Sequence, residues 1–165
     1  MNTKFYRISK GKIKIIAAKE EDAVKLSEAF DLIKNTDRVE YDYLQKRLKS
    51  VIVSSRLGST NEFFMPERIW LANRSVIVKN DVSWLASLLI HEAFHATQFK
   101  NGKYVKSLSK LEPLALRVQK KFLQKLGESG NDVDRVQKNK YWKEMTGDKA
   151  SSIYFRQLFK LYTDK

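Results

Sequence analysis

The two histidines of this chain lie four positions apart, a spacing suited to metal binding. The segment His91-Glu92-Ala93-Phe94-His95 fits the HExxH pattern, and the 165 residues contain no other histidine. Residues four apart lie on one face of an α-helix, so the two imidazoles can bind the same metal ion. Glu92 lies about 100° round the helix, where its carboxylate can take a proton from a water held by that ion. The spacing therefore predicts a metal site with Glu92 as a general base.

The residues around the motif predict a buried helix. From Ser83 to Phe99 the only formally charged residue is Glu92, in a chain that is 31% charged overall. A buried carboxylate without a partner costs several kcal/mol, and this segment has no Lys or Arg to pair with it. A metal ion with its water would satisfy Glu92 and both imidazoles together. The alternative is that both histidines are core residues bonded to the backbone, with Glu92 bonded to one of them.

The third protein ligand of such a site must be a carboxylate, because the chain has no cysteine and no third histidine. Catalytic zinc usually takes three protein ligands and keeps one position open for water. Gln98 and Asn101 occupy the places at which the longer pattern HExxHxxGxxH has its glycine and final histidine. The metzincin type of site is therefore excluded.

Glu112 is the strongest candidate for this ligand. Helical spacing places it on an apolar face with Ala115, Leu116, Gln119, Phe122, Leu123 and Leu126, while Arg117, Lys120, Lys121, Gln124 and Lys125 lie opposite. The alternative is a capping box formed by Ser109 and Glu112, with Pro113 starting the helix. Weaker candidates, all in polar or loop-like surroundings, are Glu128, Asp132, Asp134, Glu144 and Asp148.

These residues carry a resemblance to a known family. The sequence HEAFH, followed by LEPLALRVQ with Glu112 seventeen residues after His95, resembles the small gluzincin-type zinc metallopeptidases over about residues 68–126. In that family a helix after the HExxH helix supplies a glutamate ligand, often as E-x-x-A. The resemblance implies a zincin-like fold, one zinc ion on His91, His95 and Glu112, and Glu92 as the catalytic base.

The resemblance also implies where a substrate lies. An extended peptide would run along the edge strand of the sheet, for which residues 68–72, with Trp70, Leu71 and Ala72, are the nearest candidate. The family's oxyanion helper is usually a downstream Tyr or His. With no histidine left, the candidates are Tyr104, Tyr141 and Tyr154, and for each the alternative is packing in the core or at the surface.

The rest of the sequence predicts one α+β domain over residues 1–165, sheet-rich to about residue 80 and helical from about 81. Strand-like runs occur at 12–15, 51–53, 68–71 and 75–78, and helical spacing occurs at 21–34 and 40–49. Asn73 and Arg74 separate the last two runs, which predicts a hairpin leading into the motif helix. Further helices are expected near 83–99, with Asp81 or Ser83 as N-cap, and near 112–127, 133–145 and 149–162.

The chain carries a formal net charge of +13, which is unevenly distributed. Between Lys100 and Lys125 there are eight basic residues and one acid, Glu112. Three interpretations remain open: a solvated surface, a patch that attracts an acidic peptide or protein substrate, and a surface for nucleic acid or anionic membrane. The excess of lysine over arginine, without interleaved aromatics, disfavours sequence-specific nucleic-acid binding.

The function predicted from these features is hydrolysis of a peptide bond by a zinc metallopeptidase. The alternative is an inactive zincin-like scaffold that acts as a basic binding protein for an acidic protein or nucleic acid. The lack of cysteine excludes disulfide scaffolds and cysteine nucleophiles. No signal-peptide core or bilayer-spanning run is evident, so a cytoplasmic location is the default expectation, with export of a processed form as the alternative.

Overall fold

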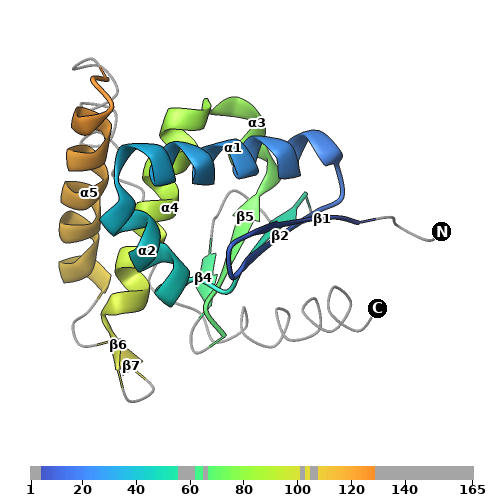
Figure 1. Ribbon diagram of the computed structural model, residues 1–165. Helices are drawn as coiled ribbons and strands as arrows, with labels where there is room; N and C mark the ends of the chain where they lie inside the picture. The colour runs from blue at the N-terminus through green and yellow to red at the C-terminus, as the bar shows by residue number, and fades with distance from the viewer. Residues whose placement is uncertain (1–4, 56–61, 65–66, 101–102, 105–107, 129–165) are drawn as a thin grey trace.

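A computed structural model describes residues 5–55, 62–64, 67–100, 103–104 and 108–128 (Figure 1). In chain order the elements are β1 (Tyr6–Lys10), β2 (Ile13–Ala17), α1 (Glu20–Thr36), α2 (Arg38–Arg47), β3 (Ser50–Ser54), β4 (Glu62–Phe64), β5 (Ile69–Asn73), α3 (Arg74–Lys79), α4 (Val82–Thr97), β6 (Phe99–Lys100), β7 (Lys103–Tyr104) and α5 (Leu108–Lys125). The predicted helices at 133–145 and 149–162 lie outside the described residues.

The main sheet is mixed and has the strand order β1-β2-β3-β5-β4. The three central strands run parallel, and β1 and β4 are antiparallel to their neighbours β2 and β5. Strands β6 and β7 form a separate two-stranded ribbon. The prediction of an α+β fold with a small mixed sheet is confirmed.

The strand at the edge of this sheet is not the predicted one. Strand β5 contains Trp70, Leu71 and Ala72, which were expected to form a free edge for a peptide. Instead β5 pairs with β3 on one side and with β4 on the other, and these three side chains are at most 2% exposed. The prediction is wrong because β4 adds to β5 and takes the edge position itself.

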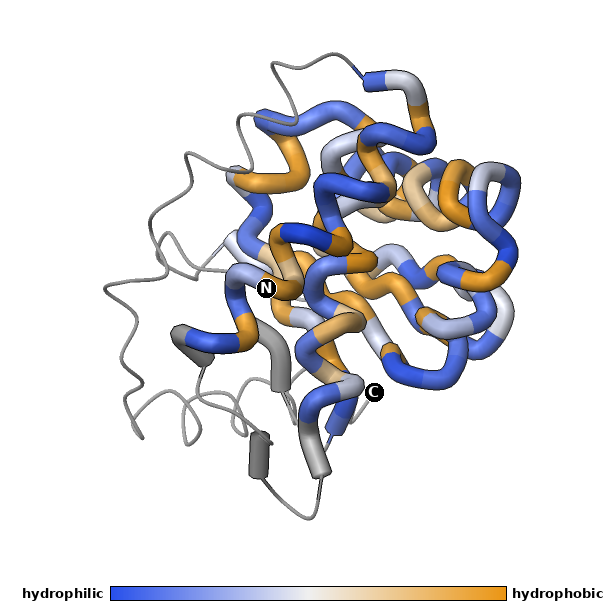
Figure 2. The backbone as a smooth tube through the Cα atoms, turned by 90° about the vertical axis from the view of Figure 1, so that its left-hand side faces the viewer, coloured by the Kyte–Doolittle hydropathy of each residue, from blue (hydrophilic) through white to orange (hydrophobic). Residues whose placement is uncertain are grey.

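The helices α1, α2 and α4 lie together on one side of the sheet (Figure 1). The main core fills the space between them and the sheet, with Phe30, Leu26, Ile15, Trp70 and Leu85 among its fully buried side chains. Alternate strand residues face the other side, where Ile16, Ile52, Ile69 and Leu71 form a smaller buried cluster. In Figure 2 the apolar residues, in orange, lie mainly where these elements meet.

The hairpin predicted after residue 71 is wrong, because residues 74–79 form the helix α3. The Asn73 side chain accepts a hydrogen bond from the Ser75 backbone N–H at 2.8 Å, so Asn73 caps a helix and does not form a turn. Ile77 then points into the main core while Val78 is 52% exposed. Burial of Ile77 and exposure of Val78 suit a short helix with one apolar side, and this packing outweighs the strand preference of the sequence SVIV. The motif helix α4 therefore follows a helix rather than a hairpin.

The N-terminal hairpin of β1 and β2 is tied to α2 by one side chain. The Gln45 amide accepts from the Lys12 backbone N–H at 2.7 Å and donates to the Lys10 carbonyl at 3.0 Å. Gly11 lies between these two residues with φ +60°, a conformation that favours glycine. Within the described ranges, none of the helices is long and apolar enough to cross a bilayer.

Candidate metal centre

Helix α4 carries the HExxH motif in the interior of the molecule. It begins at Asp81, whose carboxylate accepts from the Trp84 backbone N–H at 2.7 Å. Most of its residues are buried, including His91 at 8% and His95 at 5% exposure. The predicted burial of this helix is confirmed.

Helix α5 carries Glu112 and begins earlier than the sequence suggested. It starts at Leu108, so Ser109 lies inside the helix and cannot be its N-cap. The capping-box alternative is therefore wrong, and Pro113 lies inside the helix at an exposed position. Ala115, Gln119, Phe122 and Leu123 are buried, as predicted from helical spacing.

The two helices pack antiparallel, and three successive contacts set their register. Trp84 and Leu123 belong to one buried cluster, and one turn further along α4 the Gln119 amide donates to the Ser87 hydroxyl at 3.0 Å. At the other end Glu112 meets the two imidazoles. Ser87 and Gln119 are at most 2% exposed, so this polar contact lies inside the helix interface.

The His91, Glu112 and His95 side chains converge at the end of this interface. The two Nε2 atoms are 3.2 Å apart. Glu112 Oε2 lies 3.4 Å from His91 Nε2, and Glu112 Oε1 lies 3.0 Å from His95 Nε2. Zinc bound to N and O ligands at about 2.0–2.1 Å has tetrahedral edges of about 3.3 Å. Each of the three separations is close to such an edge, although the two distances to Glu112 involve different carboxylate oxygens. The three side chains could hold a metal ion, and they form the only group of this kind within the described ranges.

The outward nitrogens of both imidazoles are also informative. His91 Nδ1 and His95 Nδ1 are buried and have no hydrogen-bond partner. The core-histidine alternative requires hydrogen bonds from these rings to the backbone, and neither Nδ1 atom forms one. Each ring directs Nε2 to Glu112, and a neutral ring with its proton on Nδ1 offers Nε2 as a metal ligand.

The pKa values of the cluster indicate an environment that favours positive charge. Burial acts to raise the pKa of Glu112, but hydrogen bonds from His91 and His95 outweigh it and lower that pKa to about 2. Burial acts to lower the pKa of His91, but Glu112 and the negative charge of Glu92 leave it raised. The two carboxylates thus stabilise a cation at the imidazoles, and a metal ion would supply that charge.

Glu92 lies next to the cluster on the same helix and is partly buried. Burial raises its pKa, the two histidines act to lower it, and the Glu112 charge raises it further. A carboxyl group with a raised pKa is suited to accept a proton and then release it.

Of the predicted oxyanion helpers and weaker ligand candidates, only Glu128 is described together with its side chain. Tyr104 lies in β7, and nothing is described of its side chain; Tyr141 and Tyr154 lie outside the described residues. Glu128 follows the end of α5 and is not part of the metal-binding group. The remaining weaker candidates, Asp132, Asp134, Glu144 and Asp148, also lie outside the described residues.

Ser87 and Gln119 belong to the surroundings of the site but were not singled out from the sequence. Helical spacing predicts that Gln119 lies on the apolar face of its helix. A long polar residue on such a face indicates a buried polar contact. Its amide also lies close enough to His91 to contribute to the raised pKa of that ring.

Comparisons of the chain with protein families, with curated proteins and with solved structures gave no match. The resemblance to the gluzincin-type metallopeptidases therefore rests on the motif residues.

Proposed function

We propose that this protein is a zinc metallopeptidase of the HExxH type with a zincin-like fold. The observation that supports this most directly is the convergence of His91, His95 and Glu112 beside Glu92, with one ligand atom from each of the three residues within 4.8 Å of the others. Two histidines and one glutamate form a known catalytic zinc ligand set that leaves one position open.

Each residue of the centre has a role in this proposal. When bound, a zinc ion lowers the pKa of a coordinated water to about 7 and polarises a substrate carbonyl. His91 and His95 would hold the ion through Nε2, and Glu112 would hold it through a carboxylate oxygen. Glu92 would take the proton of the attacking water and pass it to the leaving amine. Its raised pKa favours the first of these transfers, because a carboxylate with a higher pKa is a stronger base.

A peptide substrate would approach the centre along β4. Within the described part of the chain this strand is the edge strand of the sheet, and it contacts α4, which carries the motif. An extended peptide can add to such an edge through main-chain hydrogen bonds. The basic face of α5, with Arg117 and Lys121, would favour acidic substrates.

The test combines metal content with peptide hydrolysis in four proteins. Wild type purified without chelators should contain about one zinc per chain and cleave members of a peptide library. Glu92→Gln should retain zinc and lose at least about 100-fold in kcat/KM, which is the lower end of the contribution expected of a general base. Glu112→Gln should lose both zinc and activity.

Glu128→Gln is the matched control, because it makes the same change near the end of α5 but outside the cluster. It should keep both zinc and activity. Wild type without zinc, or Glu92→Gln with full hydrolysis, would show that the proposal is wrong. Stoichiometric zinc without hydrolysis of any peptide would favour the inactive scaffold.

A further inference from the structure

A pocket opens between α2, α4 and α5, on a face of α4 next to the metal centre. Its volume is about 240 Å³, and it is lined by Val39, Glu40, Tyr43, Ile90, Phe94 and Val118. Ile90 and Phe94 directly precede His91 and His95, so the pocket and the metal centre use adjacent faces of the same helix. Nothing in the proposed peptidase chemistry requires this pocket.

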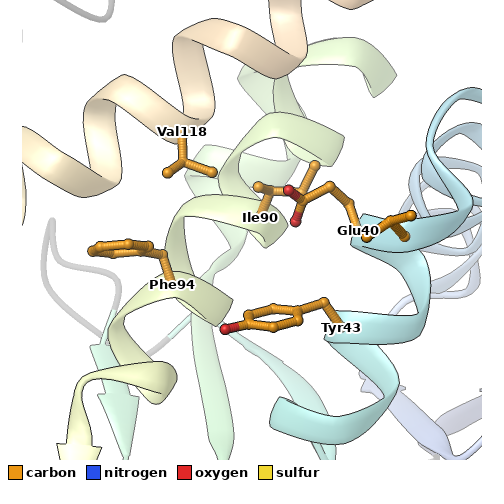
Figure 3. Close-up of a pocket in the computed structure, with 6 residues that line it drawn as sticks. Glu40, Tyr43, Ile90, Phe94 and Val118 are labelled. Carbon is orange, nitrogen blue, oxygen red and sulfur yellow. The ribbon is translucent and has the colours of Figure 1, made fainter.

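The walls of the pocket are apolar except for one carboxylate and one phenol. Figure 3 shows the Glu40 carboxylate reaching from α2 towards Ile90 and the Tyr43 hydroxyl pointing towards Phe94. Val118 of α5 points into the space from the third helix. A ligand would therefore meet aliphatic and aromatic surface along its body and a negative charge at one point.

The Glu40 carboxylate forms no salt bridge within the described part of the chain. The basic side chain whose charge acts on Glu40 is Lys125, and Lys125 pairs with Asp37. The Arg47 guanidinium lies 5.5 Å from the centre of the Tyr43 ring. Burial raises the pKa of Glu40 and the Asp37 charge raises it further, and the lowering effect of the Lys125 charge does not outweigh them. An incoming cation would therefore relieve an unfavourable carboxylate environment.

We propose that this pocket binds a primary ammonium group carried on an apolar stem, with Glu40 as its counter-ion. The volume lies below the roughly 300–1,000 Å³ of sites for drug-sized ligands, so it suits a lysine side chain or a small free amine. The stem would pack on Val39, Ile90 and Val118. The ammonium would lie beside the Glu40 carboxylate, with aromatic rings nearby.

The test follows the methyl signals of Val39, Ile90 and Val118 by NMR in the full chain. Phenethylamine should shift these signals in a saturable way. 2-Phenylethanol, which has nearly the same shape but no charge, should bind at least tenfold more weakly. Equal binding of the two compounds, or no shift with either at millimolar concentration, would overturn the proposal.

Two variants and one further ligand complete the test. Glu40→Gln should abolish the preference for the amine, while Glu28→Gln, at an exposed position of α1, should leave it unchanged. Retention of the preference in Glu40→Gln would overturn the role of Glu40. N-acetyl-lysine-N-methylamide separates the two sources of the ammonium: binding supports a peptide side chain, and its failure beside phenethylamine binding supports a free amine.

Discussion

The buried contact between Ser87 and Gln119 should show measurable energetic coupling. Ser87→Ala removes the acceptor of the Gln119 amide, and a buried group left unsatisfied costs about 1–3 kcal/mol. Gln119→Leu should cost less, about 1 kcal/mol, because the Ser87 hydroxyl keeps its 2.7 Å bond to the Trp84 carbonyl. The double variant leaves no unsatisfied amide, so its cost should fall below the sum of the single costs by about 1 kcal/mol.

Urea unfolding of the four proteins in a chelator measures this coupling without a contribution from bound metal. The same proteins are then titrated with zinc. The contact helps to set the register that places Glu112 beside the imidazoles, so Ser87→Ala should weaken zinc binding about tenfold, at the lower end of the effect of residues around metal ligands.

Gln124→Leu, on the exposed face of α5, makes the same chemical change as Gln119→Leu and should alter neither quantity. Additivity of the single variants within about 0.5 kcal/mol would refute the energetic coupling. Unchanged zinc affinity in Ser87→Ala would refute the link between register and metal binding.

Three further predictions follow from other contacts. Asp37→Asn keeps an N-cap for α2 but loses the ion pair with Lys125, so it should destabilise the protein by about 1 kcal/mol near pH 7, since half of Lys125 is exposed. Burial acts to raise the pKa of Asp37, but Lys125 lowers it below its ordinary value of 3.8, so urea unfolding of wild type and variant should converge as the pH falls below about 4. Arg74→Met leaves the buried Asp22 without its 2.6 Å partner and should cost about 2 kcal/mol in chemical denaturation, less than a fully buried pair because a third of Arg74 is exposed. Zinc at 100 times its dissociation constant should stabilise wild type by about 2.7 kcal/mol in thermal unfolding and leave Glu112→Gln unchanged.

The grouping of His91, His95 and Glu112 could be predicted because its signals are local. The HExxH spacing acts within one helix, and the apolar face of α5 already placed Glu112 on its buried side. The start of α5 was misplaced because Pro113 is typical of a first helical turn, whereas the helix extends five residues further towards its N-terminus. A proline there removes a single backbone hydrogen bond, which the packing of α5 on α4 can offset.

The elements that were missed depend on contacts that are distant in the sequence. Strand β4 is three residues long and is defined by its pairing with β5, so neither its existence nor its edge position can be read from local spacing. Residues 75–78 favour a strand by composition, but the Asn73 cap and the burial of Ile77 make them helical. At β4 a tertiary contact defines the strand, whereas at residues 75–78 a local cap and the burial of Ile77 together override the strand preference.

The proposed metal ligands lie on two helices that are separated along the chain by the ribbon of β6 and β7. An ion shared by His95 and Glu112 would tie α5 to α4 across seventeen residues of the chain. Unlike a disulfide, it would act in the folded protein only, so its contribution to stability would rise with the concentration of free metal. In a chain without cysteine, the supply of metal would then control the stability of the domain, as redox conditions control the stability of disulfide-linked domains. It would set how firmly α5 stays docked, and hence how long the protein resists proteolysis.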